Sequence, residues 1–354
     1  FIMENYFNSG GAFSSEINLP TIYDRYDYFE TMLPYTMIKV TKPFTNEELK
    51  NNIIINYAQE NGTLCIDLTQ RMRKYLNVTV LKAEESGVEN FDQKAINGTL
   101  HTIDKILIYN EEEMAGNVLN ERMRWDVSSL FPELTNNALR WEENSKHSTT
   151  YIPDGYCKRL VINGYIDNTA IYYLRPHNYD GGYPNYQGDE LLAVGRYDFE
   201  YRIPYVPAGN YEIRFGYSVS GLRAITQFYY DDKVCGIPID MSLGSNNPLI
   251  GWEDDKESDE ENKELDKSMR NRFYMKGPAS CHLDKDGKRM RDSNLALRKI
   301  VGTFYISKGD HWLRFKNVTN DIWKGEDPVQ FNQDFLEIVP TNIITNPAKP
   351  EDQN

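Results

Sequence analysis

The chain lacks the sequence signatures of several common protein classes. Its 354 residues contain no apolar run near the roughly 18 residues that a membrane-spanning helix needs. Lysines and arginines are outnumbered, 39 against 53 aspartates and glutamates, which leaves a net charge of -14. Nucleic acid requires a basic footprint, so this charge argues against a nucleic-acid partner and favours neutral or cationic ligands.

Cysteine is also scarce. The four cysteines, Cys65, Cys157, Cys235 and Cys281, are widely spaced and form no C-x-x-C pair. They allow three full disulfide pairings, and buried free thiols are an equal alternative.

Motifs for catalysis and cofactor binding are missing as well. The sequence has no P-loop, no G-x-G-x-x-G and no H-E-x-x-H. The segment "GYSVSG" (216–221) approaches the G-x-S-x-G elbow, but Ser220 stands where the second glycine belongs. We therefore predict no catalytic residues, no metal site and no cofactor. Paired carboxylates for glycoside hydrolysis stay open, because they pair in space rather than in sequence.

Tyrosine, by contrast, is abundant. The chain has 25 tyrosines against 15 phenylalanines, and tyrosine suits half-exposed β surfaces and binding faces. The segment "NYDGGYPNYQGDE" (178–190) combines rings with amides, as a sugar site does, although the same letters also build turns. Packing is the alternative role for each ring. The candidate ligand-binding residues are Tyr179, Tyr183 and Tyr186, with Asn178, Asn185 and Gln187 as polar partners and Trp252 and Trp323 as secondary candidates.

The first 110 residues predict short strands and a helix. β-Branched residues predict strands in "NNIIINYA" (51–58) and "NVTVLKAE" (77–84). Thr45, with Glu48 three residues later, predicts a helix start. Residues 111–142 show near-helical spacing, so we predict a helical connector that ends or restarts at Pro132.

From residue 150 onward, alternating apolar residues predict an antiparallel sandwich. The strands 196–206 and 211–219, joined by "PAGN", predict one hairpin, and a turn at Asp231-Asp232 predicts another. Residues 298–318 predict a strand, a turn at a glycine and a second strand, and residues 331–340 predict a last strand. Nine acids and three lysines between Trp252 and Lys267 predict an exposed insertion, a solvated helix or loop, with a cation site as the alternative.

Residues 97–107, "NGTLHTIDKIL", closely resemble the closing motif of fasciclin (FAS1) domains. The segments 188–218, 227–241 and 331–340 look like the second domain of fasciclin-containing proteins from polysaccharide-utilisation loci of Bacteroidota. These segments are also similar to the galactose-binding-like jelly roll of carbohydrate-binding modules.

The resemblance implies an α+β chain in four parts. Residues 1–110 would be the C-terminal part of a FAS1-like domain and 111–149 a helical connector. Residues 150–340 would be an antiparallel β-sandwich domain, jelly-roll and galactose-binding or carbohydrate-binding-module-like, with the acidic insertion at about 252–292, and 341–354 a tail.

The resemblance also implies a function. It indicates a non-catalytic, surface-exposed lipoprotein of the outer membrane, anchored through a lipidated cysteine that would precede Phe1. Such a protein would bind an oligo- or polysaccharide, or alternatively a peptide, and work with a SusC/SusD-type importer. A structural subunit of the transporter complex without its own ligand site is the alternative.

Overall fold

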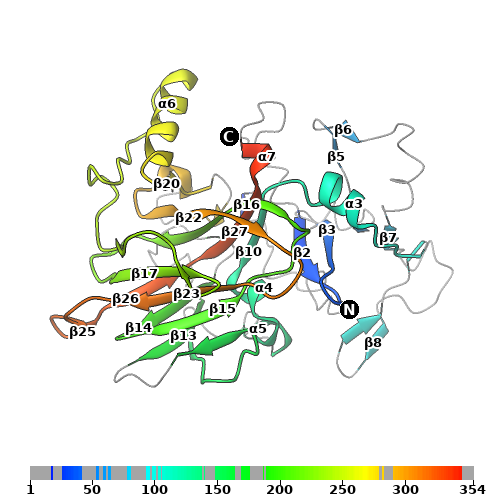
Figure 1. Cartoon of the computed structure of the whole chain (residues 1–354), viewed down its shortest axis with the longest axis horizontal. Helices are drawn as coiled ribbons and strands as arrows, with labels where there is room; N and C mark the ends of the chain where they lie inside the picture. The colour runs from blue at the N-terminus through cyan, green and yellow to red at the C-terminus, as the bar shows by residue number, and fades with distance from the viewer. Residues whose placement is uncertain are drawn as a thin grey trace.

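The described residues are mostly antiparallel β-sheet with few helices, arranged as a β-sandwich (Figure 1). This agrees with the alternation in the sequence. The computed structural model describes residues 26–41, 103–104, 106–137, 139, 148–163, 169–175, 186, 189–278 and 290–344, together with the backbone of short strands at 17–18, 53–55, 59–60, 63–64, 78–80, 93–95, 98–100 and 281–282.

Three antiparallel sheets build the sandwich. The five-stranded sheet has the order β10 (Met123–Asp126), β27 (Phe335–Pro340), β16 (Gly209–Ser218), β22 (Ala296–Ile306) and β20 (Tyr274–Lys276). The four-stranded sheet has the order β11 (Ser148–Tyr151), β13 (Ala170–Arg175), β14 (Glu190–Val194) and β26 (Gln330–Gln333). The six-stranded sheet has the order β12 (Leu160–Ile162), β15 (Asp198–Arg202), β23 (Trp312–Asn317), β17 (Ile225–Tyr230) and β18 (Lys233–Val234), with β19 (Ile239–Asp240) also paired to β17.

Phenylalanine rings from all three sheets meet in one core. The ring centroid of Phe315 in β23 lies 5.8 Å from that of Phe215 in β16 and 4.6 Å from that of Phe331 in β26. Phe199 in β15 stacks on Phe315 at 5.4 Å, and all four rings are buried. Each such pair contributes about 0.5–1.5 kcal/mol beyond the burial of its area. The six-stranded sheet therefore packs against the other two.

The last strand predicted from the sequence is two strands. β26 pairs with β14, whereas β27 pairs with β10 and β16. At the bend between them, the N–H of Asp334 donates to the carbonyl of Gly216 at 2.8 Å. A Cβ at Gly216 would lie 2.2 Å from the ring of Phe335, so the close approach of the two strands requires glycine there. The bend joins the four-stranded sheet to the five-stranded one.

One predicted hairpin is confirmed and two strand pairs are not. β17 and β18 pair around Asp231 and Asp232, whose positive φ angles of 47° and 61° are those of a type I′ turn. β15 and β16, predicted as a hairpin, lie in different sheets, and so do β22 and β23. Alternation predicts where a strand lies, but it says nothing about which strand lies beside it.

The helix predicted across 111–142 is divided into short helices by a strand. α3 (Glu111–Glu113) and the π-helical turn η3 (Met114–Val118) precede β10, and α4 (Val127–Leu130) and α5 (Pro132–Asn136) follow it. Pro132 does begin a helix, as predicted. Because β10 is buried on both faces, its residues show no alternation that would identify a strand. The predicted connector therefore supplies a strand of the sandwich.

The N-terminal region forms a small antiparallel sheet with the order β2 (Tyr26–Glu30), β3 (Met37–Thr41), β4 (Ile53–Ile55) and β7 (Val78–Val80). β4 and β7 confirm the two strands predicted from β-branched residues. β2 contacts β10, and the two lie side by side in Figure 1. The helix predicted to start at Thr45 lies outside the described residues, and the assignment to a fasciclin domain stays a prediction.

Four two-stranded sheets complete the described strands. They pair β1 (Ile17–Asn18) with β21 (Cys281–His282), β5 (Gln59–Glu60) with β6 (Thr63–Leu64), β8 (Gln93–Ala95) with β9 (Gly98–Leu100), and β24 (Trp323–Lys324) with β25 (Asp327–Pro328).

The acidic insertion contains the helix α6 (Asp259–Arg270), which agrees with the prediction of a solvated helix or loop. Ser258 caps its first turn, where three acids lie, and two cations occupy its last turn, so both ends suit the helix dipole. α6 stands at the edge of the sandwich in Figure 1. The remaining short helices are η6 (Met290–Asp292) and α7 (Thr341–Ile344), and none of the described helices is long and apolar enough to cross a bilayer.

Two of the four cysteines have described side chains. Cys157 and Cys235 are free thiols, and burial raises the pKa of Cys235 to about 11 and that of Cys157 to about 12. The side chains of Cys65 and Cys281 lie outside the described residues.

Candidate functional site

The six-stranded sheet has one side that faces away from the core and carries polar and aromatic side chains. Successive side chains of a strand point to opposite faces, so the burial of Phe199, Phe228 and Phe315 places their neighbours on the other side. We call this side the outer face. Its members are Val161, Asp198, Glu200, Arg202, Gln227, Tyr229, Val234, Trp312, Arg314 and Lys316.

The strand register brings the two aromatic residues of the outer face together. Arg314 on β23 lies opposite Glu200 on one side and opposite Tyr229 on the other. Trp312 lies two residues before Arg314, so it is a diagonal neighbour of Tyr229. Such neighbours lie about 7–8 Å apart, within reach of large side chains. Both aromatic side chains are half-buried.

An ion-pair network fixes the charged groups between these rings. Arg314 donates to both carboxylate oxygens of Asp198, at 2.7 and 2.8 Å, and Lys316 lies 3.2 Å from the same carboxylate. Burial alone would raise the pKa of Asp198, but the hydrogen bonds and charges of Arg314 and Lys316 hold that pKa below its usual range. The Arg314 guanidinium also lies 5.1 Å from the ring centroid of Tyr229. Its planar fork is therefore held in place before any ligand arrives.

Glu200 supplies a second carboxylate on the outer face. Burial, followed by the negative charge of Asp232, raises the pKa of Glu200. An ionised carboxylate can accept about four hydrogen bonds, so Glu200 retains capacity for a ligand hydroxyl or ammonium group.

The outer face thus combines two rings with donors and acceptors in fixed positions. Tyrosine and tryptophan offer an apolar surface with a polar tip. A few placed polar groups beside such a surface are the usual composition of a small-ligand site. This arrangement can bind a ligand that has both an apolar face and hydroxyl groups.

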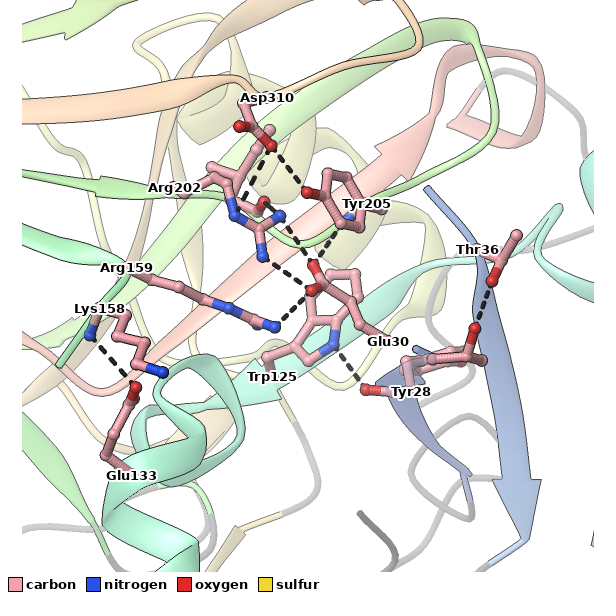
Figure 2. A network of polar contacts seen from close by, with 12 residues as sticks. Tyr28, Glu30, Thr36, Trp125, Glu133, Lys158, Arg159, Arg202, Tyr205 and Asp310 are labelled. Carbon is pink, nitrogen blue, oxygen red and sulfur yellow. Dashed lines mark hydrogen bonds and ion pairs between the residues drawn. The ribbon is translucent and has the colours of Figure 1, made fainter. Parts of the chain in front are cut away.

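A second polar cluster, which shares Arg202 with the outer face, joins the β2–β3 hairpin to the sandwich (Figure 2). Glu30 accepts hydrogen bonds from the two terminal nitrogens of Arg202 at 3.0 and 2.7 Å, from the backbone N–H of Tyr205 at 2.9 Å, and from Arg159. Nearby, the indole N–H of Trp125 donates to the carbonyl of Tyr28 at 3.0 Å. Because Glu30 is largely buried and its oxygens are occupied by protein donors, this cluster is a structural joint.

Comparisons with known proteins give only distant likenesses. No protein-family model matches the chain, and no curated protein matches it. A solved structure of Paenibacillus xanthan lyase aligns with 54% of this chain and 14% of its own length, at 15% identity and a TM-score of 0.29. The catalytic domain of a GH87 alpha-1,3-glucanase in complex with tetrasaccharides aligns with 56% of this chain and 28% of its own, at 12% identity and a TM-score of 0.25. The chain spans less than a third of the length of either protein.

Most of the ligand-binding residues predicted from the sequence lie outside the described residues. The loop that carries them connects β13 to β14 in the four-stranded sheet. At its end, the carboxylate of Asp189 accepts hydrogen bonds from the N–H groups of Val127 and Ser128 and from the hydroxyl of Tyr173. That end of the segment is therefore structural. The undescribed candidates are Asn178, Tyr179, Tyr183, Asn185 and Gln187.

Tyr186 is a core residue rather than a surface ligand contact, which corrects the prediction. Only 2% of Tyr186 is exposed, and its ring centroid lies 5.4 Å from that of Phe335. The guanidinium of Arg124 covers the ring at 4.8 Å, and the backbone N–H of Tyr186 donates to Asp334. A ligand on the surface would have no access to this ring.

The two predicted tryptophans lie apart from the outer face. Trp252 is nearly buried, and the Lys276 ammonium lies 5.2 Å from its ring, so it is a packing residue. Trp323 is 42% exposed, on the β24–β25 hairpin. Trp323 is therefore open to a ligand or partner, separately from Tyr229 and Trp312.

Tyr229, Trp312 and Arg314 were not predicted as site residues. Their signal lies in the alternation, because they occupy positions between the buried residues of their strands. The sequence does not show that β15, β23 and β17 are neighbours, since their pairing joins residues 198–202, 312–317 and 225–230.

Proposed function

We propose that the protein binds glycan on the outer face of the six-stranded sheet. The observation that carries this proposal is the placement of Tyr229 opposite Arg314, and of Trp312 two residues before it on the same face, with the arginine held by Asp198. A pyranose ring has an apolar face that can stack on such rings and hydroxyl groups that can pair with Arg314, Lys316 and Glu200.

The charges of the outer face favour neutral or cationic glycans. Arg314 and Lys316 are both within ion-pair distance of Asp198, whose single negative charge balances one of their two positive charges. Glu200 adds a further negative charge, and the whole chain carries -14. Anionic polysaccharides would meet repulsion that screening by salt reduces only in part.

We further propose an accessory role in nutrient capture. The resemblance of residues 97–107 and of the sandwich strands to fasciclin-containing proteins supports a lipoprotein on the outer-membrane surface that passes its ligand to a SusC/SusD-type importer. A peptide is the alternative ligand, because an aromatic surface with fixed charges also suits peptide side chains.

A structural role in a complex is the second candidate, and the β2–β3 turn favours it. Met32 is 88% exposed and Leu33 59%, and Tyr35 packs edge-on against Tyr205 at 5.0 Å. The Glu30 cluster holds this apolar turn against the sandwich, so it can present a rigid contact to a partner.

Affinity electrophoresis on a panel of neutral, amino-sugar and acidic polysaccharides tests the proposed function. We expect retention on a neutral or cationic glycan, weakened in Tyr229→Ala and in Trp312→Ala. Tyr305→Ala is the matched control, because Tyr305 is equally a strand tyrosine and 63% exposed, but lies on β22 of the five-stranded sheet. Absence of retention on every glycan, together with co-purification with a SusC/SusD-type pair, would favour the structural role.

A further inference from the structure

Ser307 and His311, four residues apart, form a hydrogen-bonded chain with Asp231, 80 residues away in the sequence, at one end of the six-stranded sheet. Nδ1 of His311 lies 2.7 Å from Oδ2 of Asp231, and Nε2 of His311 lies 3.2 Å from Oγ of Ser307. A nucleophile within reach of a base, which is itself oriented by a third group, is the signature of an activated serine. We propose that Ser307 is a nucleophile that hydrolyses small acyl esters, with His311 as its base and Asp231 as the orienting carboxylate.

The imidazole is held from several sides. Asp231 lies in the tight β17–β18 turn, and its other carboxylate oxygen accepts from the N–H of Trp312 at 2.9 Å. The ring of Tyr230 stacks on His311, with an interplanar angle of 10° and centroids 5.6 Å apart. The His311 side chain is only 11% exposed, whereas Ser307 is exposed. The base is therefore fixed while the hydroxyl is open to a substrate from solution.

The protonation state of His311 decides whether Ser307 is activated. Nε2 also lies 3.0 Å from the carbonyl oxygen of Ser307. The doubly protonated ring donates to this carbonyl and to Asp231, and offers no lone pair. The neutral ring, with its proton on Nδ1 toward Asp231, offers the Nε2 lone pair to the hydroxyl.

The charged neighbours of this loop have other partners. Lys308 lies 3.6 Å from Glu111, and Asp310 accepts from the hydroxyl of Tyr205 at 2.7 Å. Arg202, on the adjacent strand β15, binds Glu30. Asp232 lies next to Asp231 in the turn, and its negative charge raises the pKa of Glu200. Asp231 is thus the carboxylate that pairs with His311.

The reaction balances with water as the co-reactant. Oγ of Ser307 attacks the ester carbonyl carbon while its proton passes to Nε2 of His311. The bond to the alcohol oxygen breaks, and the imidazolium returns the proton to that oxygen. Water then loses a proton to Nε2 and attacks the carbonyl carbon of the acyl-serine. The bond from this carbon to Oγ breaks, and the imidazolium returns the proton to Oγ, which releases the carboxylic acid and restores Ser307 and the neutral ring.

The Ser307 site does not share the outer face. The His311 ring stacks on Tyr230, whose side chain points to the side of β17 opposite Tyr229. Small soluble esters are therefore the substrate class that we propose, and the reactivity of Ser307 does not rest on the proposed glycan site.

Labelling with a fluorophosphonate probe and hydrolysis of p-nitrophenyl acetate test the proposal on the whole chain. We expect one labelled peptide, containing Ser307, and measurable hydrolysis of the ester by the wild type. Ser307→Ala should abolish both, and Asp231→Asn should lower both at least about tenfold. Ser242→Ala is the matched control, because the Ser242 hydroxyl bonds Asp240 alone among the described side chains.

The outcomes separate the two proposals. No label on Ser307, or hydrolysis unchanged in Ser307→Ala with the thermal midpoint also unchanged, would overturn the nucleophile and leave His311 as a clamp of the turn. Hydrolysis of the simple ester by a protein that retains no glycan would support Ser307 and contradict the glycan site. Retention on a glycan that Trp312→Ala weakens, together with ester hydrolysis that is lost in Ser307→Ala, would support both.

Discussion

The buried carboxylate Glu337 allows the electrostatics of the five-stranded sheet to be tested. Glu337 in β27 lies opposite Arg124 of β10 and opposite Arg214 of β16. It is fully buried, with Arg124 at 2.7 Å and Arg214 and Arg298 each at 3.4 Å. One carboxylate thus serves arginines from three strands.

The stability that Glu337 contributes follows from its pKa. Burial would raise the pKa of Glu337, but the positive charges of the surrounding arginines, Arg298 and Arg124 first among them, lower it to about 2. The ordinary value for glutamate is 4.5, so the difference of about 2.5 units corresponds to about 3 kcal/mol of stability. Because the folded pKa is depressed, this stability is present above about pH 4.5 and is lost as the pH falls toward 2.

Urea unfolding at pH 7 of Glu337→Gln measures this contribution. We expect a loss of about 3–5 kcal/mol, since removing one member of a buried ion pair leaves the other charges uncompensated. Glu253→Gln is the matched control, because Glu253 pairs with Lys256 at the surface, where water and salt screen the charges, so this variant should be as stable as the wild type. The reasoning is refuted if Glu337→Gln is as stable as Glu253→Gln, or if the difference between wild type and Glu337→Gln persists unchanged at pH 2.

Two further perturbations address the edge of the sandwich and its joint with β2. Burial lowers the pKa of Lys299 to about 7, so the folded protein binds fewer protons than the unfolded chain between about pH 7 and 10.5, and stability should rise with pH over that window. Lys299→Met should remove this dependence of stability on pH and stabilise the protein at pH 7 by at least about 1 kcal/mol. Urea unfolding at pH 7 and pH 10 measures both effects. A dependence on pH that is unchanged in the variant would contradict the depressed pKa of Lys299. Glu30→Gln should weaken the cluster in Figure 2. Amide hydrogen exchange should therefore accelerate in β2 and β3, while β17 and β23 keep their protection. Equal acceleration in both regions would contradict a local joint.

The strands of the sandwich were more predictable than their partners. Alternation of Tyr197, Phe199 and Tyr201 with charged residues identified β15, and all three are buried as that alternation requires. The Asp231-Asp232 turn could be predicted because a two-residue hairpin depends on local backbone conformation. Pairing of β15 with β23 depends on contacts more than 100 residues apart along the chain, which no local pattern records.

The candidate sites were less predictable for the same reason. Tyr186 was singled out by the ring-rich loop, but Phe335, which covers it, lies 149 positions later in the printed sequence. The approach of Ser307 and His311 to Asp231 depends on β23 lying beside β17. A search for catalytic motifs along the chain therefore found none, although the fold assembles three of the side chains that such motifs supply.

Titration calorimetry with a glycan retained by the wild type tests the central claim most directly. If the outer face is the binding site, Tyr229→Ala and Trp312→Ala should each raise the dissociation constant at least about tenfold, equivalent to about 1.4 kcal/mol, while Tyr305→Ala binds as the wild type does. Wild-type affinity in Tyr229→Ala and Trp312→Ala, or an equal loss in Tyr305→Ala, would contradict a glycan site on this face.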